Sequence, residues 1–510
     1  MGDRVSGNKR IARNTFVLYI RMILKLIVSL YTSRVVLETL GFEDFGIYDV
    51  VAGFVSMFVF FNSSITNVIQ RYLNVGLARR NEKITESYFR QGFTVVIMVS
   101  LLVFAIGETI GLWFVMTQLV IPDVRIEAVF WLYQFSLVTV ICNMNQVAFI
   151  SEIVANEDMG VYAYLSVFEV LARLSVALIL KYVLFDSLLL YGFLLLLVSV
   201  LILLFYVIYC RKKYKETVLR LYLDKALLKE MGGFVGYNVF GCFSWSAAYQ
   251  GVGVLMNILG GPLVNAARGI SSQVTTAMGG FIDSVMTAFK PQIIKSYTNG
   301  DMTYMISLFE KSSKFSYVMI LMLSLPIIVN ADYVLGLWLG RVPDYAVGFV
   351  QLALLDVVVS SLSQPIWIVA NATGNIKNNQ VYGRLFTLAI LPMSYVLIYI
   401  TSNMYIPMIV IVIMQIAYWI YTLLDIKNQI NFKLCDYFKK VFIPCFIISV
   451  ASWLIYKYIG YIYTVDNIVA LLCQIIMIWL MLGLCVYFIL NKEERIFVRT
   501  LLNRYLKIKS

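Results

Sequence analysis

The sequence predicts an all-α protein, a polytopic membrane bundle of about 14 transmembrane helices. Hydrophobic residues make up 61% of the 510 residues and charged residues only 14%, with a mean hydropathy of +0.82. A soluble domain is about one half apolar and about one quarter charged. Apolar runs of the ~20 residues that a helix needs to cross a bilayer follow one another along the chain.

The apolar runs are separated by short polar or basic connections, none of which is as long as a soluble domain of about 50 residues. The predicted spans are 14–39, 44–74, 91–117, 128–152, 162–180, 188–209, 232–257, 264–289, 315–336, 347–371, 382–400, 406–424, 441–456 and 467–490.

The distribution of the 41 Lys and Arg predicts the orientation. With both termini in the cytoplasm, the outer loops hold only Arg125, Lys181, Arg341 and Lys457. Basic residues collect on the cytoplasmic side of membrane proteins. The net charge of +12 therefore reflects membrane topology, and no nucleic acid partner is expected. The basic N-terminus leads into a full-length span without a cleavage site, so we expect no removable signal peptide.

The polar residue types argue against enzyme chemistry. The chain has no histidine, which excludes His-based triads, and its seven cysteines include no C-x-x-C pair. No phosphate-binding loop or paired-carboxylate motif is present. We therefore expect no catalytic residues, no metal and no cofactor, apart from H⁺ or Na⁺ as a coupling ion.

The connection between the sixth and seventh spans mixes basic residues with leucines and predicts a helix on the inner membrane face. This divides the chain into an N-terminal lobe at 1–209, a cytoplasmic linker helix at 210–231, a C-terminal lobe at 232–424, and two further spans with a basic tail at 425–510. An offset of 219 residues aligns Thr39-Leu40-Gly41 with Ile258-Leu259-Gly260, which indicates that the two lobes are parallel repeats.

Cations inside the predicted spans are the strongest functional signal. Each one near the middle of a bilayer costs roughly 2.5–3.5 kcal/mol on insertion scales and usually faces a bundle interior or water. Arg21 and Lys25 are four residues apart and share a helix face, close to the face of Asn14. Both side chains donate hydrogen bonds suited to phosphate or carboxylate oxygens. We expect these three residues to line a cationic, substrate-binding cavity, with an ion pair to another span as the alternative.

Other charged residues read as ion pairs or gates. Arg34 has Glu38 four residues later, and Arg173 has Glu169 four residues earlier, spacings that favour local pairs. Under the repeat offset Arg268 matches Asp49, which predicts an ion pair between the lobes at the outer mouth. Asp283 and Asp356 are candidates for proton or sodium coupling, because they sit deepest in the second lobe.

The layout of six, six and two spans, with Asn14-Thr15, Leu40-Gly41 and Phe45-Gly46-Ile47-Tyr48, resembles the polysaccharide (O-antigen or capsule) flippases of the multidrug/oligosaccharidyl-lipid/polysaccharide exporter superfamily. The resemblance covers the whole chain. It implies a V-shaped, alternating-access transporter in the bacterial cytoplasmic (inner) membrane. Such a protein flips undecaprenyl-diphosphate-linked oligosaccharide repeat units for surface polysaccharide synthesis. Its partners would be this lipid-linked oligosaccharide, membrane lipids and other polysaccharide-assembly membrane proteins.

Three alternatives remain open on the sequence. A drug/cation antiporter of the same superfamily would have twelve spans and an acidic or aromatic pocket. A lipid II flippase is a close relative that the sequence separates poorly. A membrane polysaccharide polymerase or ligase would need a large outer loop with catalytic residues, and the longest outer loop, near Thr117–Glu127, shows no such set.

Overall fold

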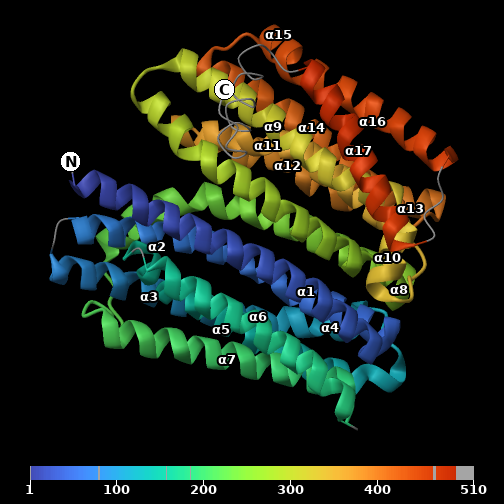
Figure 1. Ribbon diagram of the computed structural model, residues 1–510. Helices are drawn as coiled ribbons and strands as arrows, with labels where there is room; N and C mark the ends of the chain where they lie inside the picture. The colour runs from blue at the N-terminus through green and yellow to red at the C-terminus, as the bar shows by residue number, and fades with distance from the viewer. Residues whose placement is uncertain (1, 79–80, 157, 184, 463–466, 490–510) are drawn as a thin grey trace. The chain divides into compact units, whose positions relative to one another are not determined.

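The computed structural model describes residues 2–78, 81–156, 158–183, 185–462 and 467–489. These residues form helices and short connections, with no strand among them, so the all-α prediction is confirmed (Figure 1). The helices are α1 (Gly2–Ser56), α2 (Phe60–Ala78), α3 (Glu82–Ile106), α4 (Leu112–Gln118), α5 (Ile126–Ala155), α6 (Met159–Ile179), α7 (Ser187–Lys213), α8 (Lys225–Thr298), α9 (Met302–Val329), α10 (Ala331–Leu339), α11 (Ala346–Thr373), α12 (Arg384–Leu388), α13 (Ile390–Thr401), α14 (Ile406–Ile430), α15 (Leu434–Tyr437), α16 (Ile443–Ile462) and α17 (Ile468–Ile489).

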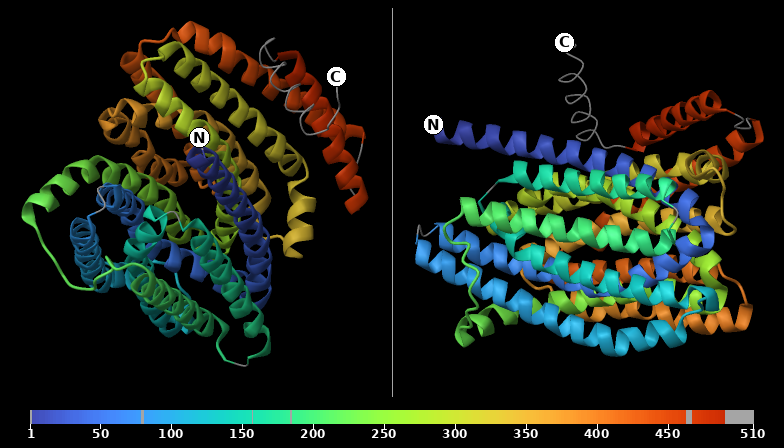
Figure 2. Two further views of the ribbon diagram at one scale, coloured as in Figure 1. Left: turned by 60° about the vertical axis from the view of Figure 1, so that its left-hand side comes forward. Right: turned by 90° about the horizontal axis from the view of Figure 1, so that it is seen from below.

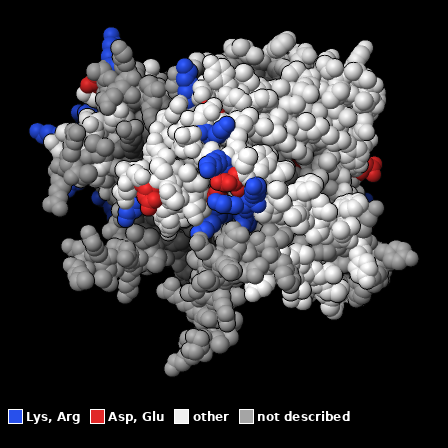
Figure 3. All heavy atoms as spheres, turned by 90° about the horizontal axis from the view of Figure 1, so that it is seen from above, with Lys and Arg blue, Asp and Glu red and all other residues white. Residues whose placement is uncertain are grey.

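The helices account for the predicted spans. Ten stretches of the described residues are long and apolar enough to cross a membrane, and one of them, Val239–Asp283, holds two predicted spans. Of the three predicted spans outside these ten, 14–39 lies in α1, 44–74 runs from the second half of α1 into α2, and 441–456 lies mostly in α16. The face drawn in Figure 3 is largely uncharged, with basic side chains more frequent than acidic ones. The chain is a multi-pass membrane protein, and about 14 spans agree with its helices.

Two long helices are each broken by a glycine with a positive φ angle. α1 turns at Gly41 (φ 75°) and α8 turns at Gly261 (φ 78°). Glycine adopts this backbone conformation without the steric cost that other residues meet. The two breaks lie 220 residues apart, so the internal repeat is visible in the backbone. The offset between the repeats is 220 residues, one more than the 219 predicted from the sequence. The equivalent of Gly41 is Gly261 rather than Gly260.

Contacts divide the chain into two compact units. Unit 1 holds Met1–Gln273, Trp338–Phe349 and Lys377–Met414, and unit 2 holds Val274–Leu337, Val350–Ile376 and Gln415–Ser510. In unit 1, α5 packs against α1, α2, α3 and α7, and α1 also packs against α6 (Figure 1). In unit 2, α9 packs against α16 and α17. The lobe boundaries predicted from the sequence stay predictions.

The prediction of a surface helix over 210–231 is wrong. α7 continues to Lys213, residues 214–224 are not helical, and α8 begins at Lys225. Both views of Figure 2 show the chain between α7 and α8 without helical coils.

Side-chain acceptors on α3 explain why this segment forms no helix. The backbone amide of Tyr222 donates to Thr94 Oγ1 at 2.9 Å, and that of Asp224 donates to Gln91 Oε1 at 2.8 Å. Gln91 and Thr94 are both buried. These two backbone donors are thus satisfied by contacts with α3 and do not need helical hydrogen bonds.

Candidate functional site

A largely buried ion pair lies in unit 1, about two helical turns past the glycine break of each long helix. Arg268 Nη1 on α8 donates to Asp49 Oδ2 on α1 at 3.4 Å. The side chain of Arg268 is 8% exposed and that of Asp49 is 23% exposed, so water screens the pair only weakly. The structure thus brings together the two residues that the repeat matched in the sequence. The gating role predicted for them stays a prediction.

Neutral groups complete the coordination of both charges. Asn265 Nδ2 donates to the Gly46 carbonyl at 3.1 Å and to Asp49 Oδ2 at 3.3 Å. Arg268 Nη2 donates to the carbonyl of Tyr249. These three side chains and two carbonyls join the second half of α1 to α8 on both sides of the α8 break. Sequence reasoning missed Asn265, although its spacing from Arg268 on one helix face was readable.

Two glycines allow this close approach of helices. A Cβ atom on Gly46 would lie 2.0 Å from the carbonyl oxygen of Pro262, and one on Gly269 would lie 2.8 Å from Asp49 Cγ. In the register set by the glycine breaks, Asp49 is equivalent to Gly269. The two repeats therefore meet at equivalent positions, where glycine on one helix leaves room for the carboxylate on the other.

Gly46→Ala should destabilise the protein, because the added methyl group would collide with a backbone carbonyl that cannot rotate away. Overpacking of this kind costs roughly 1–3 kcal/mol. The measurement is the melting temperature of the purified protein in detergent. Gly160→Ala is the matched control, because a Cβ at Gly160 on α6 meets no atom within 4 Å. The control should have the melting temperature of the wild type or a higher one. Equal melting temperatures of the two variants would contradict the close approach of Gly46 to Pro262.

The predicted cationic cavity residues lie on α1. The helix runs unbroken from Gly2 to the break at Gly41, so Arg21 and Lys25 are separated by about one turn. The side chain of Lys25 is exposed. The side chains of Asn14 and Arg21 lie outside the described part of the chain. Their role in binding substrate stays a prediction.

The local pairs predicted from helical spacing are present in the structure. Arg34 Nε donates to Glu38 Oε1 at 2.9 Å, and Lys181 Nζ binds the other oxygen of Glu38 at 3.1 Å. Arg173 Nη2 lies 2.9 Å from Glu169 Oε1. Each of these side chains is about one third exposed or more, and such pairs contribute little to stability.

The two coupling candidates in unit 2 differ in burial. Asp356 on α11 is only 4% exposed. Asp283 on α8 is exposed, in contrast to the expectation that it lies deep. Ile282 and Met286 face the core of unit 2. Asp283 follows Ile282 and is rotated from it by about 100° around the helix axis, which turns its side chain away from that core. The structure therefore leaves Asp356 as the buried carboxylate of the two.

Sequence reasoning missed charged residues on α9. Lys314 is 3% exposed, and Glu310 is 9% exposed and binds Lys440 Nζ at 3.1 Å. The sequence placed both in the connection before a span at 315–336, whereas α9 begins at Met302. The apolar spacing that signals this longer helix is present in Met305, Leu308 and Phe309.

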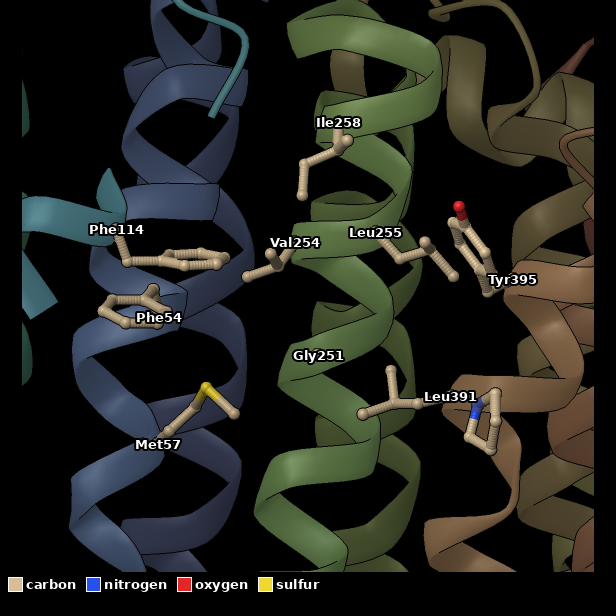
Figure 4. A pocket seen from close by; sticks show the side chains of 10 residues that line it. Phe54, Met57, Phe114, Gly251, Val254, Leu255, Ile258, Leu391 and Tyr395 are labelled. Carbon is tan, nitrogen blue, oxygen red and sulfur yellow. The ribbon is translucent and has the colours of Figure 1, made fainter. Parts of the chain in front are cut away.

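An open apolar pocket of about 440 Å³ lies in unit 1 (Figure 4). Phe54 and Phe114 stack with ring centroids 5.1 Å apart and line one side of the pocket. Leu255 and Leu391 line the opposite side. The only polar side-chain group in the lining is the hydroxyl of Tyr395. This chemistry suits a hydrocarbon chain. The lining residues are Phe54, Met57, Phe114, Gly251, Val254, Leu255, Ile258, Leu391, Pro392 and Tyr395.

Comparisons with known proteins identify the fold. No protein-family model and no curated protein sequence matches the chain. Among solved structures, an inward-facing multidrug resistance MATE family transporter of the MOP superfamily matches with a TM-score of 0.65 and 14% identity. This match covers 80% of the chain and 98% of the transporter. An outward-facing structure described in the same words matches with a TM-score of 0.63 and 14% identity, covering 83% and 96%.

The lipid II flippase MurJ, in an inward closed conformation, is also similar. Its TM-score is 0.59 at 13% identity, and the match covers 96% of the chain and 100% of the flippase. At these identities the likeness concerns the fold. The chain therefore has the fold of MOP-superfamily transporters, as the sequence resemblance implied.

Proposed function

We propose that the chain is a flippase for undecaprenyl-diphosphate-linked oligosaccharide repeat units, which it moves from the inner to the outer leaflet of a bacterial cytoplasmic membrane. The coverage of the structural matches carries the proposal. The lipid II flippase covers 96% of this chain, whereas the two multidrug transporters cover 80% and 83%. A likeness over nearly the full length, including two helices beyond twelve spans, favours a lipid-linked cargo. The glycan would serve O-antigen or capsule synthesis.

The α1 cations would bind the cargo. Arg21 and Lys25 would donate to diphosphate or acidic sugar oxygens, with Asn14 on a nearby face. Charge-assisted hydrogen bonds to phosphate are about twice as strong as neutral ones. The exposed position of Lys25 supports this role, because the side chain is accessible to a ligand.

Asp49 and Arg268 would act as a gate between α1 and α8 in a cycle of alternating access. Asp356 would serve as the coupling carboxylate for H⁺ or Na⁺, and its burial supports that role more than the exposure of Asp283 does. Placing a carboxylate inside the membrane costs free energy. A chain that keeps one usually has a function for it, so Asp356 is a functional candidate.

Export of a drug or organic cation is the second candidate function. The observation in its favour is the higher TM-score of the multidrug transporter, 0.65 against 0.59 for the lipid II flippase. The exposed cation on α1 argues against a cationic cargo, because like charges repel.

Deletion of this chain in its host tests the proposal. Undecaprenyl-linked repeat units should accumulate on the cytoplasmic face, and surface polysaccharide should be lost. Normal glycan export with new sensitivity to cationic drugs would instead favour the antiporter. Units that reach the outer face but stay unpolymerised would favour a polymerase or ligase.

A further inference from the structure

The last turn of α7, its connection to α8 and the first residue of α8 are together strongly basic. Residues 211–225, called the basic strap below, carry six Lys or Arg and two Asp or Glu. Lys213 is bound to Asp158 at 2.6 Å. The other basic residues are exposed, and they are Arg211, Lys212, Lys215, Arg220 and Lys225.

Specific contacts at its start hold the basic strap in place. Tyr214 is buried, and its hydroxyl donates to the carboxylate of Asp158, the residue before α6. Burial and the hydrogen bond to Asp158 raise the pKa of Tyr214 above its ordinary value, so the hydroxyl keeps its proton at neutral pH. The strap is therefore anchored to the start of α6 as well as to α7.

Contacts with α3 fix the second half of the basic strap. Arg90 Nε donates to the Arg220 carbonyl at 3.3 Å, and the Arg90 guanidinium lies 5.1 Å from the centroid of the Tyr222 ring. The amides of Tyr222 and Asp224 bind α3 as described above. The charged side chains thus project from a fixed backbone, which lowers the entropy lost when they bind a ligand.

Three leucines alternate along this fixed segment. Leu219, Leu221 and Leu223 are 38%, 64% and 49% exposed. Tyr222 and Asp224, which alternate with Leu221 and Leu223, donate their amides to α3, and the three exposed leucines form one apolar row. An apolar row beside Lys and Arg is the pattern of segments that lie in a membrane interface.

The level of the strap along α3 agrees with this reading. Its binding partners Gln91 and Thr94 lie at the start of the apolar part of α3, after the polar first turns that begin at Glu82. The strap therefore crosses α3 where the helix passes from water into the membrane.

We propose that the basic strap is a binding site for anionic phospholipids. The Arg and Lys side chains bind the headgroup phosphates, and the leucine row packs against the first methylene groups of the acyl chains. An acidic protein surface would satisfy the charges but would leave the leucines exposed to water. The inference concerns the lipid surrounding the protein and is independent of the cargo.

Native mass spectrometry of the full-length protein in detergent tests this site, with titration of phosphatidylglycerol or phosphatidylcholine. The strap variant is Arg211→Gln, Lys212→Gln and Lys215→Gln. Each basic residue near an anionic surface contributes about fivefold in affinity, so the variant should bind phosphatidylglycerol about 100-fold more weakly. Its affinity for phosphatidylcholine should be unchanged.

The matched control neutralises three exposed lysines outside the strap, Lys427→Gln, Lys433→Gln and Lys439→Gln, and should keep the wild-type affinity for the first phosphatidylglycerol. A second measurement needs no variant: raising the salt concentration should weaken wild-type binding of phosphatidylglycerol but not of phosphatidylcholine. An equal loss in the strap variant and the control would overturn the proposal, because net charge alone would explain it. An unchanged affinity in the strap variant would also overturn it, because the strap would then not be the site of lipid binding.

Discussion

Arg268→Gln should lower the stability of the purified protein by about 3–5 kcal/mol, because it leaves the largely buried Asp49 carboxylate without its cationic partner. The substitution also removes the hydrogen bond to the Tyr249 carbonyl. The measurement is thermal unfolding in detergent. The double variant Asp49→Asn/Arg268→Gln should recover most of the loss, because it removes both charges together.

The exposed pair of α1 provides the control for this prediction. Arg34 and Glu38 have side chains that are 39% and 38% exposed, so Arg34→Gln should cost less than about 1 kcal/mol. If Arg268→Gln melted at the same temperature as Arg34→Gln, the buried pair would not stabilise the contact between α1 and α8. A double variant that is stable but transports abnormally would support the gating role.

Replacing Arg21 and Lys25 together with glutamine should reduce glycan transport by about 100-fold or more. Each hydrogen bond from a charged donor contributes about 1.5–3 kcal/mol, and each 1.4 kcal/mol is a factor of ten in binding. The measurement is the amount of surface polysaccharide per cell, with the wild type and the double variant expressed at the same level. The double variant should also melt like the wild type if the side chains face a water-filled cavity.

Lys181→Gln is the control for transport. Lys181 is an exposed cation that binds Glu38 but does not itself lie on α1 with Arg21 and Lys25. It should leave the surface polysaccharide near the wild-type level. Normal transport by the Arg21→Gln/Lys25→Gln variant would contradict the cargo-binding role of the α1 cations, whatever the cargo is.

The sequence was sufficient for features that depend on short-range patterns. Apolar runs located the spans, and the spacing of Arg34 with Glu38 and of Arg173 with Glu169 predicted ion pairs that the structure contains. The repeat offset matched Asp49 with Arg268, which lie in contact. The predicted offset was one residue too small at the break. Gly260 and Gly261 are adjacent in the sequence, and only the positive φ angle of Gly261 shows which of them is the break.

Features that depend on long-range contacts were not predictable. The basic strap was expected to be helical, yet acceptors on α3, more than 100 residues earlier, bind its amides. The alternation of Leu219, Leu221 and Leu223 was a readable sign of an extended chain. Lys314 was assigned to a connection because it is charged, whereas the packing of unit 2 buries it.

The most direct test of the proposed function is reconstitution of the purified protein into vesicles that carry a fluorescent undecaprenyl-diphosphate oligosaccharide in both leaflets. A membrane-impermeant reagent that destroys the exposed label should reach about half of it in protein-free vesicles. With the wild-type protein it should reach nearly all of the label, and the Arg21→Gln/Lys25→Gln variant should behave like protein-free vesicles. Protection of half of the label by vesicles that contain folded wild-type protein and an imposed H⁺ or Na⁺ gradient would contradict the flippase account.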